Sequence, residues 1–91
     1  MKYTIVVTKQ YKKAFKKIKH NRKLVKELEL VVDILATDDI LDKKYRDHYL
    51  SGILKDFREL HVRPNLLLVY RKYEDKLVLI LANLGSHNEL F

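Results

Sequence analysis

Residues 56–70 constrain the fold of this chain more than any other stretch. The second part, Leu66 to Tyr70, is almost purely apolar, and a strand that is apolar on both faces usually lies in the middle of a sheet. The first part mixes charged residues and a histidine with apolar residues. Pro64 and Asn65 separate the two parts, and both residue types favour turns. The stretch therefore predicts two adjoining central strands, residues 55–62 and 66–72.

The N-terminal part predicts one strand and two helices. Residues 3–7 are rich in β-branched side chains and predict the strand. Thr8 is placed to cap a first helix, and Asn21 to cap a second. Apolar residues recur at helical spacing in both helices, as Tyr11, Ala14, Phe15 and Ile18 and then as Leu24, Val25, Leu28, Val31, Val32 and Leu35. The short connection between them predicts an antiparallel helical hairpin.

The first helix also carries six lysines between its apolar positions. They are Lys9, Lys12, Lys13, Lys16, Lys17 and Lys19. Such a face either follows the phosphates of a nucleic acid or is simply solvated, and the pattern leaves both interpretations open.

The rest of the chain completes an α+β fold. Residues 36–47 are polar and irregular and predict a loop. Glu74 and Asp75 predict a hairpin turn before a third apolar strand, residues 77–81, while Gly85 permits a sharp exit and Ser86 caps a last helical turn. We expect one domain, residues 1–91, with the order β-α-α-β-β-β and the helical hairpin on one face of an antiparallel sheet.

Composition narrows the class of protein. The formal net charge of +7 predicts an anionic partner, either nucleic acid or an acidic protein. The absence of cysteine excludes disulfides and thiolate metal sites. There is no apolar run of membrane-spanning length and no signal-peptide pattern, so we expect a cytoplasmic protein without a membrane partner.

Histidines are the residues best suited to chemistry. An imidazole titrates near pH ~6.5, so two neighbouring imidazoles can act as base and acid at neutral pH. Such a pair, with an arginine for the phosphate charge, would suffice for RNA cleavage without a metal or other cofactor. Three histidines, His48, His61 and His87, lie near loop or strand ends in the second half, although any one of them taken alone is better explained as a polar residue at a strand end. His20 follows the lysine-rich helix and is expected to be exposed. A metal site is weakly supported because the histidines lack a ligand spacing, and no nucleophile-elbow motif is present.

Arg58 has two possible roles. In a regular strand Arg58 and His61 point to opposite faces, whereas Phe57, Glu59 and His61 share one face. If Arg58 and His61 serve one site, a bulge or strong twist must lie between them. Otherwise Arg58 is structural and pairs with an acidic loop residue such as Asp47.

Three motifs resemble one known family. They are Tyr45-Arg46-Asp47-His48-Tyr49-Leu50-x-Gly52, then Phe57-Arg58-Glu59-Leu60-His61-Val62-x-Pro64, and Gly85-Ser86-His87-Asn88-Glu89-Leu90-Phe91. With Leu67 to Tyr70 between the second and third, the chain resembles over its whole length the YafQ branch of the RelE/ParE superfamily of type II toxins. The resemblance implies the same fold and a metal-independent endoribonuclease that cuts mRNA on the ribosome and stops translation.

The resemblance also assigns site residues. It implies catalytic roles for His48, His61, His87 and Phe91, the last by stacking on a nucleobase. Lys55, Arg58, Arg63 and Asn65 are expected to contact substrate. The chain departs from the family at Asn65, where aspartate is usual, and at Leu66, which is often aromatic; asparagine takes no proton but still forms hydrogen bonds.

The resemblance implies three partners: a cognate antitoxin, mRNA and the ribosome. It implies contact with DNA only indirectly, through the antitoxin complex. Two other functions remain open. Asn65 favours a non-catalytic module that binds antitoxin or RNA, whereas a ParE-like inhibitor of gyrase is disfavoured because gyrase poisoning requires no set of histidines.

Overall fold

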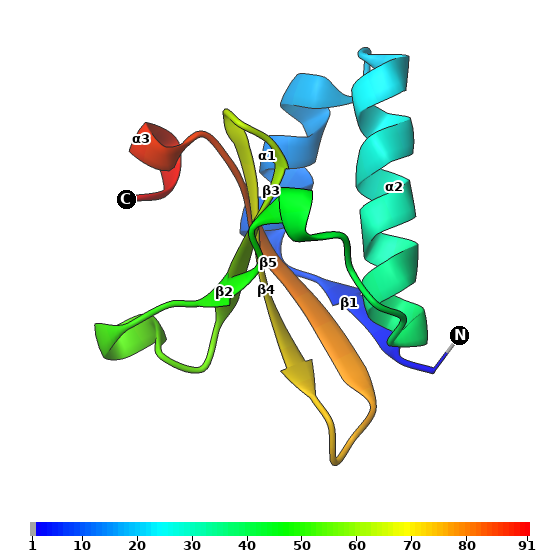
Figure 1. Ribbon diagram of the computed structural model, residues 1–91. Coiled ribbons are helices and arrows are strands. Elements are labelled where there is room, and N and C mark those ends of the chain that lie inside the picture. Colours follow the sequence, from blue (N-terminus) through cyan, green and yellow to red (C-terminus); the bar gives the residue numbers. More distant parts are fainter. Residues whose placement is uncertain (1) are drawn as a thin grey trace.

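A five-stranded sheet forms the centre of the molecule in the computed structural model, which describes residues 2–91. The elements are β1 (Thr4–Val7), α1 (Lys9–Ile18), α2 (Arg22–Thr37), β2 (His48–Tyr49), β3 (Arg58–Arg63), β4 (Leu66–Tyr73), β5 (Val78–Gly85) and α3 (His87–Leu90), with 3-10 turns at Lys43–Tyr45 (η1) and Gly52–Leu54 (η2). The strand order is β1-β5-β4-β3-β2. Figure 1 shows α1 and α2 together on one side of the sheet and α3 on the other.

β4 occupies the middle of the sheet, as its apolar sequence predicts. Its first five residues, Leu66 to Tyr70, are all buried. One set of side chains on the sheet faces the helices and forms the core with them. This core contains Tyr11, Leu28, Val31, Val32, Leu35, Leu60, Leu68, Tyr70, Leu79, Leu81 and Leu84. The α+β class and the helical hairpin on one face are confirmed.

The predicted helix caps are present. The Thr8 side chain accepts a hydrogen bond from the backbone N–H of Tyr11 at 3.1 Å and donates one to the carbonyl of Ala82 at 2.6 Å. Asn21 accepts a hydrogen bond from the N–H of Leu24 at 3.2 Å. These bonds satisfy donors that a helix start leaves unpaired, and Thr8 also attaches α1 to β5.

Several boundaries differ from those predicted. β3 begins at Arg58 rather than at residue 55, because η2 and a hydrogen bond from the Phe57 N–H to the Leu54 carbonyl close a turn first. β5 runs four residues past the predicted end, to Gly85. The two-residue strand β2 was not predicted, and η1 interrupts the predicted loop of residues 36–47.

Two further differences concern strand pairing and a glycine. β1 lies parallel to β5, whereas the other neighbouring strands are antiparallel, as expected. Gly85 does not have a positive φ. Its small size matters instead, because a Cβ at this position would lie 3.1 Å from Oε1 of Glu89.

Among residues 2–91, no helix has the length and apolar character needed to cross a membrane.

Candidate functional site

The pairing of β2 with β3 places His48 and His61 on the same face of the sheet. His48 lies opposite Glu59 in this antiparallel pair, so their side chains project in the same direction. His61 follows Glu59 by two residues and therefore shares that face. Leu60, between them, is fully buried against the helices. The imidazole centroids of His48 and His61 lie 6.4 Å apart on the face opposite α1 and α2.

Glu59 provides a buried carboxylate between the two histidines. Its Oε1 atom lies 3.9 Å from Nε2 of His48 and 3.8 Å from Nε2 of His61. Glu59 is only 5% exposed and is the one buried charged or polar residue among residues 2–91. Buried carboxylates are rare unless they are paired. We did not predict a role for Glu59, although the shared parity of Glu59 and His61 is a signal that the sequence contains.

A backbone contact fixes the orientation of His48. Nδ1 of His48 lies 2.7 Å from the carbonyl oxygen of Arg46. A carbonyl only accepts hydrogen bonds, so Nδ1 carries the proton and Nε2 of the neutral ring has a free lone pair. That nitrogen is the one facing Glu59. His48 is therefore oriented to accept a proton through Nε2.

His87 and Phe91 form a second group on α3. A reciprocal capping box stabilises this short helix: Ser86 accepts a hydrogen bond from the N–H of Glu89, and the Glu89 carboxylate accepts one from the N–H of Ser86. The rings of His87 and Phe91 have centroids 5.3 Å apart. Phe91 is 54% exposed and so does not cap the core.

The sheet register relates the two groups to each other. His61 is paired with Leu67, and Leu67 with Gly85, so α3 leaves the sheet in the row that contains His61. α3 lies on the side of the sheet opposite α1 and α2 (Figure 1). No hydrogen bond or ion pair within residues 2–91 joins the groups directly. The structure thus gives a His48–Glu59–His61 cluster and, nearby along the sheet, a His87–Phe91 group.

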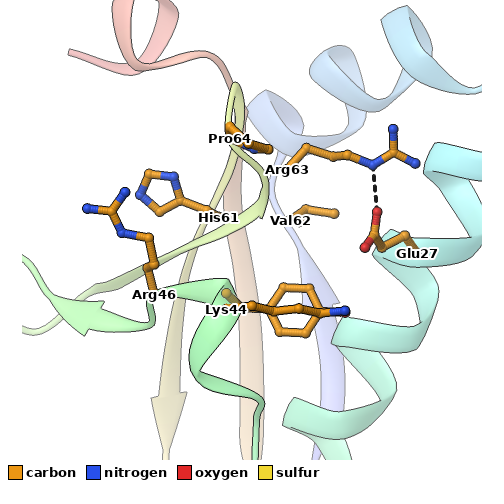
Figure 2. A pocket seen from close by; sticks show the side chains of 8 residues that line it. Glu27, Lys44, Arg46, His61, Val62, Arg63 and Pro64 are labelled. Carbon is orange, nitrogen blue, oxygen red and sulfur yellow. Dashed lines mark hydrogen bonds and ion pairs between the residues drawn. The ribbon is translucent and has the colours of Figure 1, made fainter.

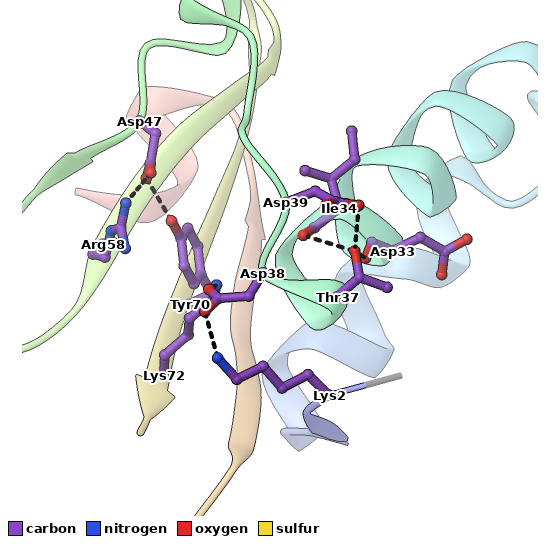
Figure 3. Close-up of polar contacts among 10 residues, drawn as sticks. All are labelled: Lys2, Asp33, Ile34, Thr37, Asp38, Asp39, Asp47, Arg58, Tyr70 and Lys72. Atoms are coloured by element: carbon purple, nitrogen blue, oxygen red, sulfur yellow. Dashed lines mark hydrogen bonds and ion pairs between the residues drawn. The ribbon is translucent and has the colours of Figure 1, made fainter. Parts of the chain in front are cut away.

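Arg58 makes the contact with Asp47 that the structural one of its two possible roles predicts. The register shift in β3 lies between His61 and Arg63, so Arg58 and His61 keep opposite faces. The Arg58 guanidinium forms an ion pair with Asp47, and the Tyr70 hydroxyl donates a hydrogen bond to the same carboxylate at 2.5 Å (Figure 3). Burial, followed by the contact with Asp47, raises the pKa of Tyr70, so its hydroxyl stays protonated. This network anchors the residue that precedes His48.

The other residues expected to contact substrate lie around the site. Lys55 is exposed and ends η2. Asn65 is exposed in the turn between β3 and β4, where it lines a surface cavity with Ser86 and Glu89. Arg63 is engaged by Glu27, with Nε 2.6 Å from the carboxylate oxygen.

A cavity of about 350 Å³ opens beside His61. It lies between α2, η1 and the end of β3 (Figure 2). Its lining consists of Glu27, Lys44, Tyr45, Arg46, His61, Val62, Arg63 and Pro64. The basic residues Lys44 and Arg46 were not among the predicted site residues. Within residues 2–91, no group of three or more His, Asp or Glu side chains is arranged to hold a metal ion.

Comparison with known proteins gives consistent matches over nearly the whole chain. The family model described as "Bacterial toxin of type II toxin-antitoxin system, YafQ" matches residues 3–91. The mRNA interferase toxin YafQ of Escherichia coli K12 is 35% identical over 83 residues, which are 90% of this chain and 88% of that protein. A metal-bound toxin from Helicobacter pylori is 47% identical, with a TM-score of 0.89 over 98% of this chain and 99% of that chain. The E. coli DinJ-YafQ complex gives 27% identity and a TM-score of 0.86 over 98% of each chain.

Proposed function

The chain belongs to the YafQ family of toxins of type II toxin–antitoxin systems, and we propose that it acts as an endoribonuclease on mRNA. The observation that carries this proposal is the His48–Glu59–His61 cluster on the open face of the sheet. An imidazole beside a carboxylate can accept a proton from the RNA, and this chemistry needs no nucleophilic side chain. The relatives named mRNA interferase toxins support the same substrate.

The proposed cleavage is an intramolecular transesterification, in which the phosphoryl group passes from the 5′-oxygen of one nucleotide to the 2′-oxygen of the preceding one. The ribose 2′-hydroxyl loses its proton and attacks phosphorus, the 2′-oxygen–phosphorus bond forms, and the bond from phosphorus to the 5′-oxygen breaks. The leaving 5′-oxygen takes up a proton. The products are a 2′,3′-cyclic phosphate and a 5′-hydroxyl, and each positioned acid or base contributes about 10²–10⁴ in rate.

We assign the base to His48 and the acid to His87. His48 has a free lone pair on Nε2, because its Nδ1 proton is donated to a backbone carbonyl. The imidazolium that forms then lies beside the Glu59 carboxylate. In an in-line displacement the attacking and leaving oxygens lie on opposite sides of phosphorus. A base from the β2–β3 cluster and an acid from α3 suit this geometry, with His61 beside the phosphate.

Phe91 is proposed to bind a nucleobase next to the cleaved bond. Its ring is exposed and lies beside His87. Stacking on an aromatic ring tolerates any base and is worth about 1–3 kcal/mol. Asn65 and Lys55, both exposed, are proposed as polar contacts to the RNA.

The proposed partners are mRNA, the ribosome and a cognate antitoxin. The E. coli relative forms a complex with DinJ, and the net charge of +7 favours both RNA and an acidic protein partner. Contact with DNA is proposed only through the antitoxin complex, and the proposed compartment is the cytoplasm, where translation occurs.

Controlled expression in a bacterial host tests the function. Incorporation of labelled methionine and of labelled thymidine is followed after induction. We expect translation to stop first, His61→Ala to abolish the effect, and co-expression of the antitoxin to restore growth. If replication stopped first, a gyrase inhibitor would be the better explanation and the proposal would be wrong.

A further inference from the structure

Arg46 lies near the histidine cluster and, unlike Arg58 and Arg63, forms no ion pair with a carboxylate of residues 2–91. Arg58 is paired with Asp47, and Arg63 with Glu27. Arg46 is exposed and forms no ion pair with an acidic group in the described chain. A free guanidinium is therefore available on the face that bears the site.

The Arg46 side chain reaches the cavity of His61. Both residues line that cavity, and in Figure 2 the guanidinium extends toward the His61 imidazole. Lys44 lines the same cavity but points away, with Nζ 5.1 Å from the centre of the Tyr45 ring. Of the cationic groups in this cavity, Arg46 is therefore the one directed at a catalytic histidine.

The backbone of Arg46 contributes to the site as well. Its carbonyl accepts the hydrogen bond from Nδ1 of His48 at 2.7 Å. The residue has a φ of 53° where it ends η1. Non-glycine residues rarely adopt this left-handed conformation, which glycine adopts without strain. Strained residues often cluster at functional sites, and one residue here orients His48 and directs a cation toward His61.

We propose that Arg46 binds the non-bridging oxygens of the scissile phosphate and stabilises the charge that develops on them during cleavage. This inference rests on the proposed endoribonuclease function. A guanidinium presents a planar pair of N–H donors that matches two phosphate oxygens. It neither gains nor loses a proton, so the proton transfers remain those of the histidines. Arg46 thus fills the cationic role that the ion pair with Asp47 denies to Arg58.

The test compares Arg46 variants with a neighbour that carries the same charge. Arg46→Ala and Arg46→Gly are expected to lower the single-turnover cleavage rate by about 10²–10³-fold, as when a donor to a developing oxyanion is removed. Lys43→Ala removes one charge from the same turn, but its side chain is outside the His61 cavity. We expect its rate to stay within about twofold of wild type.

Two further measurements separate a role in chemistry from a role in folding. Arg46→Gly relieves the positive φ, so its melting temperature should equal or exceed that of wild type while its activity is lost. Added guanidinium ions should restore part of the activity of Arg46→Ala and leave Lys43→Ala unchanged. The proposal is overturned if the folded Arg46→Ala and Lys43→Ala proteins cleave at the same rate.

If the wild-type protein cleaves no RNA, the proposed function is refuted. An RNA-binding assay then tests separately whether Arg46 contacts phosphate. The probe is a short single-stranded RNA with a 2′-O-methyl group at every position, which cannot be cleaved. Loss of one phosphate contact should reduce the slope of log affinity against log salt by about 0.7 for Arg46→Ala. Equal slopes for wild type and Arg46→Ala would overturn the assignment.

Discussion

Glu59 is a single buried charge between the two histidines of the proposed site. A carboxylate that is 5% exposed is costly to bury unless cations or donors lie beside it. Here one oxygen faces the Nε2 atoms of both His48 and His61 at just under 4 Å. At this distance the attraction to an imidazolium is about 4 kcal/mol when the effective dielectric constant is near 20. The carboxylate is therefore placed to stabilise the charge that a histidine gains when it removes a proton.

Replacing Glu59 with glutamine tests this interpretation. Glutamine keeps the shape of the side chain but removes the charge, so the imidazolium formed during catalysis loses its counter-ion. We expect Glu59→Gln to lower the cleavage rate by about 10–10²-fold in single-turnover assays, with little change in RNA affinity. A cleavage rate within twofold of wild type would show that Glu59 has no electrostatic role.

Phe91→Ala should affect binding rather than folding. The ring is 54% exposed, so its removal leaves no core cavity. Loss of one stacked base is worth about 1–3 kcal/mol, which corresponds to a five- to 150-fold rise in KM or Kd. The melting temperature should not change. Ile40→Ala is the matched control because Ile40 is almost fully exposed and lies far along the chain from the site; a similar loss of affinity in both variants would contradict the stacking role.

The placement of the site residues could be predicted from the sequence where the signal is local, while their roles stay predictions. The motifs identify His48, His61 and His87, and the structure brings the first two together. Arg46 lies inside the first motif, but its orientation depends on how η1 packs beside α2 and β3. The packing of η1 leaves no periodic pattern in the sequence, so the orientation of Arg46 could not be predicted.

At the scale of elements, β2 depends on a polar network for its position. The strand is two residues long, so its ladder alone holds it weakly. Asp47 supplements that ladder by accepting from both Arg58 and Tyr70. The Arg58 guanidinium also lies 5.1 Å from the ring centre of Tyr49. The network therefore fixes His48 indirectly, from the opposite face of the sheet.

Asp47→Ala should reduce both stability and activity. It leaves a partly buried guanidinium and a buried hydroxyl without their acceptor, which costs about 2–3 kcal/mol. The cleavage rate should fall because β2, which carries His48, loses part of its attachment to the sheet. Urea unfolding and cleavage assays measure the two effects. Asp56→Ala is the matched control, since its exposed contact with Arg71 spans 3.9 Å and should contribute less than about 1 kcal/mol. Equal stability of the two variants would contradict the anchoring role.

Asp38 connects the end of α2 to β4 and to the N-terminal segment. Its carboxylate lies 2.7 Å from Nζ of Lys72 and 2.9 Å from Nζ of Lys2 (Figure 3). The hydrogen bonds from Lys72 and then Lys2 lower the pKa of Asp38 from 3.8 to about 2. In the folded state this carboxyl therefore binds a proton less readily than in the unfolded state.

Asp38→Asn should remove a stabilisation that depends on pH. Because the folded pKa lies below the unfolded one, the stabilisation is complete above about pH 5 and is lost as the pH falls toward 2. The free energy of unfolding should differ most between wild type and Asp38→Asn at neutral pH, and the difference should shrink in acid. Asp33→Asn, an exposed site on α2, is the control. A difference that stays constant between pH 7 and pH 3 would contradict the linkage.

The element boundaries show the limit of local sequence patterns. Caps and apolar stripes predicted α1, α2 and β4, because each has its own periodicity or a turn residue at its end. β2 has neither, since two residues show no alternation and the strand exists only through its pairing with β3. The parallel pairing of β1 with β5 is likewise not a local feature, because both helices and the strands β2, β3 and β4 separate these two strands in the sequence.

At the scale of the whole molecule, the two faces of the sheet differ in what they contact. One face supplies the core with α1 and α2. The other carries the histidine cluster and α3. The lysine-rich surface of α1 approaches α3 through the contact of Lys17 with Glu89 at 3.7 Å. The lysine-rich surface of α1 therefore reaches α3, which carries His87 and Phe91.

RNA cleavage by the purified chain tests the central claim most directly. Wild type, His61→Ala, His87→Ala and the control His20→Ala are incubated with mRNA, with and without ribosomes, after circular dichroism has confirmed that each is folded. We predict that wild type and His20→Ala cleave, and that His61→Ala and His87→Ala lose at least about 10²-fold in rate. Undiminished cleavage by folded His61→Ala and His87→Ala would contradict the account.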